Sequence, residues 1–300
     1  EPPPIKFVFT WAAVQRDFPG GSPLLFQKGE SAVDYRKFAL FSDLDGTLFN
    51  DDTKVSERNL RALEYFTSNG GVFCVSTGRT PKNAAPFLKG AAINGPGIFY
   101  NGAAAYSYKE GRYVLTHNLD SRALTPLMQQ LLAEYPAINI QVYDTEDICF
   151  ISPEKLANQE FVQAHQPCVF RPLEEVSDPW LKILMQGTPE QLREIEPLVL
   201  SQTKGIASAV YSSPQYFELL PLGVSKGSTL KELSHTSLLD GRILVAIGDY
   251  YNDMELLRTA DISAAPANAL PEVRETADHI VCSNNEGAVA DLIERILPRL

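Results

Sequence analysis

The chain has 300 residues, of which 44% are hydrophobic and 21% are charged, and its formal net charge is −11. This length predicts two domains or one large domain, and the apolar fraction is sufficient for hydrophobic cores. The strong negative charge argues against nucleic acid or an anionic membrane surface as the main partner, because both bind basic patches.

The first 36 residues differ in composition from the rest of the chain. They combine a proline-rich start, a Phe/Trp patch and a Pro-Gly-Gly sequence. This mixture is too aromatic for simple disorder and too interrupted by Pro and Gly for a long helix. We predict an extension, residues 1–36, that packs on the body and whose role the sequence does not indicate. Because the chain begins with Glu rather than Met, we expect a processed or trimmed product. A targeting segment removed from it would leave no trace in this sequence.

A regular α/β pattern begins at residue 37. Short apolar runs alternate with helical patterns, and Ser56 is placed to cap the first helix. This alternation predicts a parallel sheet with helices on both faces. The predicted elements are strands at 38–42, 72–76 and 98–100, a helix at 56–68 and a second helix entered at Pro81.

The pattern changes between about residues 102 and 222, where strands come in pairs, and the α/β pattern then resumes. We therefore predict a Rossmann-like, doubly wound core (37–102 and 223–300) interrupted by an inserted α+β cap domain (103–222). The insertion is predicted to hold strands at 103–108, 113–116, 138–142, 148–151, 181–186, 207–211 and 216–220, and helices at 122–134 and 189–200. The second part of the core is predicted to hold helices at 226–235, 252–259 and 288–297, and strands at 243–247 and 261–264.

Cysteine usage and hydropathy bear on the compartment. The four cysteines are scattered and include no CxxC pair, so they predict neither a disulfide framework nor a zinc site, and a reducing compartment such as the cytoplasm fits best. No apolar run approaches the roughly 18 residues that span a bilayer.

Two aspartates directly follow the first predicted strand, in the sequence DLDGT at 43–47. Open α/β sheets bind ligands at the carboxyl ends of their strands, and Asp43 and Asp45 are spaced to share one crevice there. Two neighbouring carboxylates repel unless a cation joins them, and their hard oxygens suit Mg²⁺. A DxD pair alone also suits two solvated turn acids; its place at a strand end, followed by Gly-Thr, favours the functional interpretation.

A second acidic cluster follows the predicted strand at 243–247. Asp249 is placed to complete the protein ligands of a cation. Asn252 and Asp253 fall in the first turn of a helix, where an acid can act simply as a partner of the helix dipole. That explanation suits Asp253 well and Asp249 poorly.

Two further signals lie at strand ends. Thr77, in STGR at 76–79, offers a hydroxyl beside backbone N–H groups, an arrangement that binds anions. An ordinary helix cap explains it equally well. Lys226, which opens a helix, offers the positive charge that a phosphoryl group needs, although a lone lysine there is usually a solvated surface residue.

Together these four signals resemble the motifs of the haloacid-dehalogenase superfamily of phosphatases, and within it the Cof-type hydrolases. DLDGTL at 43–48, STGR at 76–79, VSKG at 224–227 and GDYYND at 248–253 match the four motifs in the family's order. The cap lies between the second and third motifs, as in Cof-type members. The two tyrosines of the fourth motif are unusual for the family, and residues 1–36 match nothing in it.

The resemblance implies a Mg²⁺-dependent phosphatase that forms an aspartyl-phosphate. In it Asp43 would be the nucleophile and Asp45 the general acid and base. Mg²⁺ would be bound by Asp43, Asp249 and the backbone carbonyl of Asp45. Thr77, Lys226 and Asn252 would contact the substrate, mainly at its phosphoryl group, and Asp253 would orient metal-bound waters or Lys226. The substrate would be a small phosphorylated metabolite, a sugar phosphate or a phosphorylated cofactor; neither its identity nor the oligomeric state is indicated.

The sequence argues against some other functions of the same fold and leaves others open. Halide displacement needs neither Mg²⁺ nor a proton donor, so the acid at Asp45 argues against a dehalogenase. P-type ATPases share the nucleophile but need membrane spans. A phosphomutase of the phosphomannomutase kind shares the motifs and would need a bisphosphate activator. A catalytically inactive ligand-binding protein of this fold is the alternative from another class.

Selectivity is expected to reside in the inserted cap, because the core motifs handle only the phosphoryl group. The glycine-containing junctions at 101–102 and 222–223 are predicted hinges that let the cap close and exclude water. A structural insertion that only enlarges the fold is the alternative. The candidate substrate contacts in the cap are His165, Arg171, Trp180 and Lys182, although Trp180 equally suits a core position.

Overall fold

A computed structural model describes residues 33–156 and 168–300. Val33–Leu300 form one compact unit. Most of the predicted extension at 1–36 lies outside the described residues, and so does His165.

A five-stranded parallel sheet forms the core of this unit, in the order β14-β13-β12-β1-β2. The register pairs Ser42 of β1 with Ile247 of β12, so these two strands end at the same level. Every strand of this sheet pairs in parallel, as the α/β pattern predicted. The strands are β1 (Phe38–Ser42), β2 (Val72–Val75), β12 (Ile243–Ile247), β13 (Ile262–Pro266) and β14 (His279–Val281).

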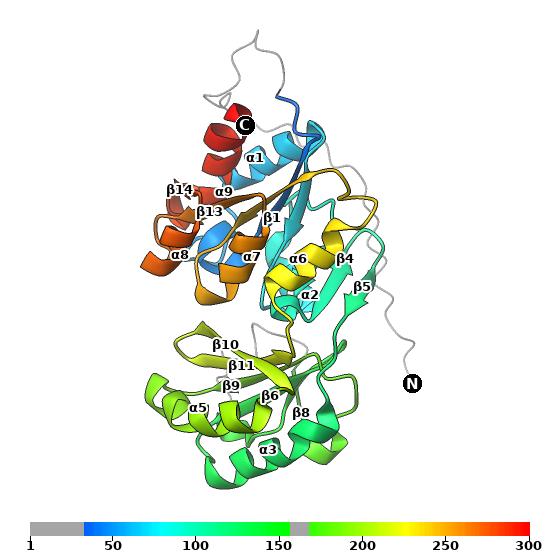
Figure 1. Ribbon diagram of the computed structural model, residues 1–300, viewed down its shortest axis with the longest axis vertical. Coiled ribbons are helices and arrows are strands. Elements are labelled where there is room, and N and C mark those ends of the chain that lie inside the picture. Colours follow the sequence, from blue (N-terminus) through cyan, green and yellow to red (C-terminus); the bar gives the residue numbers. More distant parts are fainter. Residues whose placement is uncertain (1–32, 157–167) are drawn as a thin grey trace. The chain divides into compact units, whose positions relative to one another are not determined.

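Helices cover both faces of this sheet (Figure 1). Leu40 of β1 packs in a cluster with α1 (Glu57–Ser68) and the helical segment that begins with α9 (Ala288–Asp291). The next residue, Phe41, packs on the opposite side, with helices α6 (Lys226–Ser234), α7 (Met254–Thr259) and α8 (Pro271–Thr276). Because neighbouring strand residues point to opposite faces, a continuous apolar run is needed when both faces are buried.

A smaller antiparallel sheet, β3-β4-β5, adjoins the core. Its strands are β3 (Gly97–Phe99), β4 (Ala104–Ser107) and β5 (Arg112–Thr116), and a bridge from Ser76 to Ile98 joins β3 to the end of β2. Strands β4 and β5 lie within the predicted insertion at 103–222, yet β4 pairs with β3 of the core segment, and β5 pairs with β4. The short helix α2 (Pro81–Ala84) opens at Pro81, capped by Thr80.

The rest of the insertion forms a six-stranded sheet in the order β10-β11-β9-β6-β7-β8. Helices α3 (Ser121–Glu134) and α5 (Pro189–Thr203) pack on one face of it, in a hydrophobic cluster of their own. Asp120 and Thr188 cap these helices. The strands are β6 (Asn139–Tyr143), β7 (Ile148–Phe150), β8 (Cys168–Phe170), β9 (Lys182–Gln186), β10 (Ala207–Ser213) and β11 (Tyr216–Pro221).

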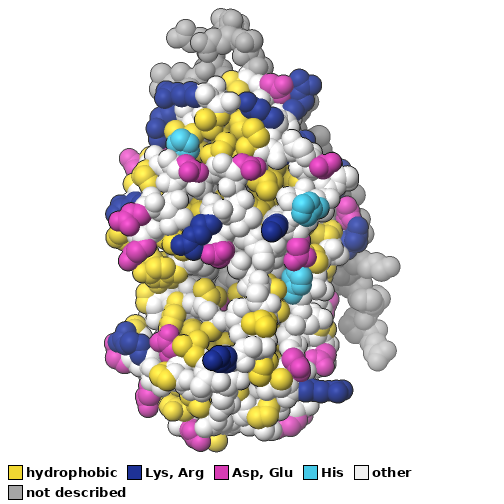
Figure 2. Space-filling view, viewed as in Figure 1, with side chains coloured by type: hydrophobic (Ala, Val, Ile, Leu, Met, Phe, Trp, Pro, Cys, Tyr) yellow, Lys and Arg dark blue, Asp and Glu magenta, His cyan; other side chains and the backbone are white. Residues whose placement is uncertain are grey.

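Core and insertion together confirm the predicted fold class, a parallel α/β sheet with an added α+β part. Within the described ranges, no helix is both long and apolar enough to cross a bilayer. On the face drawn in Figure 2, basic and acidic side chains are interspersed.

Candidate active site

The carboxyl end of β1 places Asp43 at the centre of the site. The Asp43 N–H donates to the carbonyl oxygen of Ile247 on β12 over 2.9 Å. The residue is 7% exposed, and its Oδ1 lies 2.6 Å from Lys226 Nζ. The sequence predicted that these loops release their side chains into one crevice, and the structure brings Asp43, Lys226, Asp249 and Asp253 together there.

Lys226 is a fully buried cation between two carboxylates. It is the first residue of α6, which Ser225 caps by accepting a hydrogen bond from the Ser228 N–H. Its Nζ donates to Asp43 Oδ1 and to Asp253 Oδ1, each at 2.6 Å. Burial alone would lower the pKa of Lys226, but the carboxylates of Asp253 and Asp43 outweigh it and raise that pKa. The lysine therefore stays charged, and the surface interpretation of this residue is wrong.

Asp249 lies beside this ion pair, directly after β12. Its Oδ1 accepts a hydrogen bond from Thr47 Oγ1 over 2.8 Å. Gly46 leaves room for the carboxylate, because a Cβ at that position would lie 2.5 Å from Asp249 Oδ2. Burial, and next the charge of Asp253, raise the pKa of Asp249 to about 7. Burial likewise raises the pKa of Asp43, although Lys226 acts in the opposite direction.

Asp253 is hydrogen-bonded at both of its carboxylate oxygens. Oδ1 accepts from Lys226, and Oδ2 accepts from the backbone N–H groups of Asp249 at 3.0 Å and Tyr250 at 3.2 Å. A Cβ at Gly248 would lie 2.4 Å from Asp253 Cγ, so the loop closes around this carboxylate only with glycine there. Asp253 thus holds both the lysine and the loop that carries Asp249, which is more than a helix-dipole partner does.

Asp43, Asp249 and Asp253 form a compact acidic cluster. One carboxylate oxygen from each lies within 4.8 Å of the others. A single lysine does not balance three largely buried carboxylates, and the raised pKa values of Asp43 and Asp249 express that imbalance. A divalent cation would supply the missing charge, and the hard oxygen donors of this cluster fit Mg²⁺.

Asp45 lies at the rim of the site, paired with an arginine that had no predicted role. Arg79 Nε and Nη2 donate to the two carboxylate oxygens of Asp45 at 2.8 and 2.6 Å. The guanidinium also lies over the rings of Phe49 and Phe87, with its carbon 5.6 and 4.9 Å from their centroids. This bidentate, stacked arrangement fixes the Asp45 side chain in one orientation. Arg79 belongs to the STGR motif, which was the only signal for it.

Thr77 is buried where the chain leaves β2. Its Oγ1 accepts a hydrogen bond from the Arg79 N–H over 3.1 Å, and its own N–H donates to the Ile98 carbonyl oxygen over 2.9 Å. Thr77 lines the same cavity as Asp43, Asp45 and Asn252. The structure therefore places all of the predicted core residues in or directly beneath one pocket.

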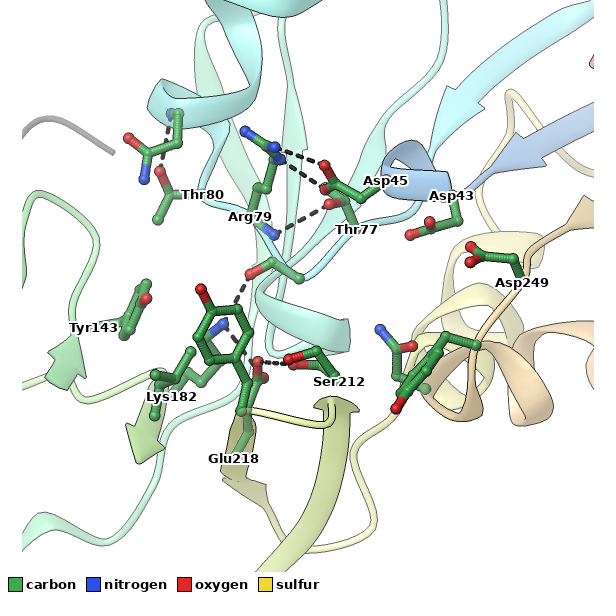
Figure 3. A pocket seen from close by; sticks show the side chains of 17 residues that line it. Asp43, Asp45, Thr77, Arg79, Thr80, Tyr143, Lys182, Ser212, Glu218 and Asp249 are labelled. Atoms are coloured by element: carbon green, nitrogen blue, oxygen red, sulfur yellow. Dashed lines mark hydrogen bonds and ion pairs between the residues drawn. The ribbon is translucent and has the colours of Figure 1, made fainter. Parts of the chain in front are cut away.

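That pocket has a volume of about 380 Å³ and is lined by both the core and the six-stranded sheet (Figure 3). Tyr143, Lys182 and Glu218 face it from the insertion. Lys182 Nζ donates to the Gly78 carbonyl oxygen over 2.9 Å and lies 3.3 Å from a Glu218 oxygen. Burial lowers the pKa of Lys182, and Glu218 partly offsets that effect. Of these three residues, the sequence pointed only to Lys182.

Two of the other candidate contacts in the insertion, Arg171 and Trp180, lie elsewhere. Arg171 pairs with Asp147 at 2.9 Å and is not among the residues that line the pocket. Trp180 is 2% exposed and packs in the hydrophobic cluster beneath the six-stranded sheet, so it is a core residue. His165 lies outside the described residues.

Carboxylates at the strand ends of an open α/β sheet, beside a buried lysine that opens a helix, suit the binding of a phosphate ester. A family model described as haloacid dehalogenase-like hydrolase matches residues 40–293. A solved structure of a haloacid dehalogenase-like hydrolase from Bacteroides thetaiotaomicron superposes with a TM-score of 0.76 at 26% identity, covering 86% of this chain and 99% of that one.

Curated relatives extend the comparison. The chloroplastic endoribonuclease YBEY of Arabidopsis thaliana is 28% identical over 276 residues, which are 85% of this chain; the chain spans about half (46%) of the length of that relative. The 5-amino-6-(5-phospho-D-ribitylamino)uracil phosphatase YitU of Bacillus subtilis is 22% identical over 272 residues, 87% of this chain and 98% of YitU. The chain belongs to the haloacid dehalogenase-like hydrolase family, and the resemblance seen in the four sequence motifs is confirmed.

Proposed function

We propose that this chain is a Mg²⁺-dependent phosphatase that hydrolyses the phosphate monoester of a small metabolite, with Asp43 as its nucleophile. One observation carries the proposal: Asp43 Oδ1 lies 2.6 Å from a fully buried lysine, beside Asp249 and at the base of a pocket of about 380 Å³. A pocket of this size takes a metabolite-sized ligand. Relatives named as phosphatases, YitU among them, support this reaction.

In the first half of the proposed reaction, a carboxylate oxygen of Asp43 attacks phosphorus. The new O–P bond forms as the bond to the ester oxygen breaks, and the leaving oxygen takes a proton from the carboxylic acid of Asp45. Lys226 and Thr77 hold the phosphoryl oxygens, and Asn252 makes a further polar contact with the substrate. The product of this half is an aspartyl-phosphate and a free alcohol.

In the second half, water attacks the phosphorus of the aspartyl-phosphate. Asp45, now a carboxylate, takes a proton from that water, the bond from phosphorus to the Asp43 oxygen breaks, and inorganic phosphate leaves. The bidentate contact with Arg79 holds Asp45 at the rim, where a leaving group would pass. Both of its oxygens accept from the guanidinium there, so the acid step requires Asp45 to leave Arg79 and take up a proton first.

The cation would be held by Asp43, Asp249 and the backbone carbonyl of Asp45. When bound, it would balance the charge of the carboxylates and of the phosphoryl oxygens. Asp253 is a poorer ligand in this proposal, since both of its oxygens already accept hydrogen bonds from Lys226 and the 249–250 backbone.

A screen of four phosphorylated metabolites tests the proposal directly. Glucose 6-phosphate, ribose 5-phosphate, pyridoxal 5′-phosphate and flavin mononucleotide are incubated with the protein and Mg²⁺ but without any bisphosphate activator, and released phosphate is measured. We expect hydrolysis of at least one, its loss in EDTA, its return with excess Mg²⁺ and inhibition by Ca²⁺, which prefers more ligands and longer bonds. Activity that survives exhaustive chelation would contradict the proposal.

Affinity for Mg²⁺ is expected to depend on pH. The pKa of Asp249 is about 7 without the cation, so at pH 6 this group is mostly protonated and a cation must displace its proton. At pH 8 the carboxylate is already free. We therefore expect Mg²⁺ to bind about tenfold more tightly at pH 8 than at pH 6, as measured by titration calorimetry. Equal affinity at both values would show that no proton is displaced from Asp249 when the cation binds.

A further inference from the structure

One peptide group in the loop between β2 and α2 is held at both ends. Its N–H, that of Arg79, donates to Thr77 Oγ1 over 3.1 Å. Its carbonyl oxygen, that of Gly78, accepts a hydrogen bond from Lys182 Nζ over 2.9 Å. A trans peptide group is planar, so its C=O and N–H point in opposite directions. A contact that holds the carbonyl oxygen toward Lys182 therefore also holds the N–H toward Thr77.

Gly78 makes this peptide easy to turn over, because glycine reaches backbone conformations that other residues avoid. A larger residue does not fit there, since a Cβ at Gly78 would lie 2.9 Å from Asn101 Nδ2. Asn101 is itself buried and donates to Glu218 over 2.6 Å, so it cannot easily move aside. The packing thus requires glycine at this position, and the direction of the 78–79 peptide depends on the groups that bind it.

Lys182 is fixed where it can bind that carbonyl oxygen. It opens β9 of the inserted sheet and is 2% exposed. Its Nζ lies 3.3 Å from Glu218 Oε2 and 4.4 Å from the centre of the Tyr143 ring. Glu218 Oε1 in turn accepts a hydrogen bond from Ser212 Oγ over 2.5 Å (Figure 3). These contacts engage the amine of Lys182, so it is poorly placed to bind a substrate directly.

The direction of the peptide decides what the Thr77 hydroxyl can do. A hydroxyl oxygen accepts hydrogen bonds at its lone pairs and donates one hydrogen. While Thr77 Oγ1 accepts from the Arg79 N–H, its hydrogen is donated to no other group in the described part of the chain. Thr77 lines the pocket that also holds Asp43. If the peptide turned over, the Gly78 carbonyl oxygen would face Thr77 and accept that hydrogen instead.

We propose that Lys182 is a positioning residue: by holding the Gly78 carbonyl oxygen, it keeps the Thr77 hydroxyl available as a donor to the phosphoryl group of the substrate. This rests on the proposed phosphatase function. Lys182 belongs to the insertion and Gly78 to the core, so the contact requires the six-stranded sheet to lie against the core as it does in this structure. Docking of the insertion and binding of a phosphoryl group therefore favour each other.

The test removes the lysine amine without leaving a buried carboxylate unpaired. Lys182→Met/Glu218→Gln replaces both charged groups of the pair. The amide of the introduced glutamine can accept from Asn101 and donate to Ser212, so the neighbouring hydrogen bonds persist. Glu218→Gln alone is the matched control, because the amine of Lys182 can still donate to the Gly78 carbonyl oxygen.

Two further variants separate this role from a general effect on docking. Thr77→Val removes the hydroxyl through which Lys182 is proposed to act. Lys82→Met removes an ion pair of 2.6 Å to Glu146, which also joins core and insertion but lies outside the pocket. Titration calorimetry measures the affinity for inorganic phosphate in the presence of Mg²⁺. Values of kcat/KM are measured with the fastest of the four metabolites above and with p-nitrophenyl phosphate, and thermal unfolding checks that each variant is folded.

We expect Lys182→Met/Glu218→Gln to bind inorganic phosphate about tenfold more weakly, because one donor to a charged group is lost. Its kcat/KM should fall by a similar factor for both substrates, since Thr77 contacts the phosphoryl group that they share. Glu218→Gln and Lys82→Met should each change these values by less than about threefold. In the Thr77→Val background the paired substitution should cost less than about twofold, because its target hydroxyl is already absent.

A tenfold loss that persists in the Thr77→Val background would show that Lys182 does not act through this hydroxyl. A loss confined to the metabolite would show that Lys182 contacts the substrate directly, and an equal loss in Lys82→Met would show that any weakening of the junction suffices. Each of these results overturns the inference alone. Wild-type protein that hydrolyses none of the five phosphates would overturn the proposed function, and this inference with it.

Discussion

Asp43→Asn is expected to lower kcat by about a thousandfold or more while leaving the protein folded. The substitution removes the charge that attacks phosphorus but keeps an oxygen that can accept the 2.6 Å hydrogen bond from Lys226. Lys226 also keeps Asp253 as its counter-ion. The measurements are phosphate release with the best metabolite of the screen and thermal unfolding of both proteins.

Asp45→Asn provides the matched comparison, because it removes a proton donor and leaves the nucleophile in place. It should still release p-nitrophenol in a single turnover, since that leaving group departs without a proton, while hydrolysis of an alkyl phosphate is lost. If folded Asp43→Asn protein turned over at a substantial rate, the covalent route through Asp43 would be ruled out.

The central fold was predictable because its local patterns and its packing agree. Strand 243–247 was predicted with its observed bounds, as an apolar run buried on both faces. Ser56 was predicted to cap the first helix, and its Oγ does accept a hydrogen bond from the Asn59 N–H. Where one face is exposed or an element is short, the signal fades. Strand β8, whose residues are only half-buried, and the six-residue helix α8 were therefore missed.

The residues of the site likewise differ in how well the sequence predicted them. Asp43, Thr77 and Asp249 follow strands of the parallel sheet, so chain order alone predicts that they meet. Lys226 instead opens helix α6. Glu218 lines the pocket from inside a strand, where no local feature marks it. Its hydrogen-bond partner Asn101 lies more than a hundred residues earlier in the chain. Contacts of that kind depend on how two sheets pack together, and sequence periodicity does not specify packing between them.

Strands β4 and β5 illustrate the same limit. The change from α/β to paired strands near residue 102 was visible in the sequence, and it suggested a boundary there. Pairing partners are a property of the folded sheet, and β4 pairs with β3 of the core segment. The link from the core to the six-stranded sheet lies further along the chain than the point where the pattern changes. It follows β5, near Leu119, which forms a bridge with Trp180.

The second large effect is expected at Lys226, whose positive charge lies between two buried carboxylates. Lys226→Met keeps the length of an apolar stem and removes the charge. Removing one partner of a buried ion pair typically costs about 3–5 kcal/mol of unfolding free energy, because the remaining charges are left uncompensated. Activity should fall with it, since the proposed phosphoryl contact is lost.

The destabilisation by Lys226→Met is further expected to grow with pH. Burial already raises the pKa of Asp43, and loss of the lysine raises it more, so the folded variant binds protons that the unfolded chain, with ordinary carboxyl pKa values, has released. Its stability relative to wild type therefore falls as pH rises from 5 to 8, as urea unfolding at both values would measure. Lys231→Met, at an exposed lysine of the same helix, should leave stability unchanged within about 0.5 kcal/mol. A pH-independent difference between Lys226→Met and wild type would mean that Lys226 does not compensate the carboxylates.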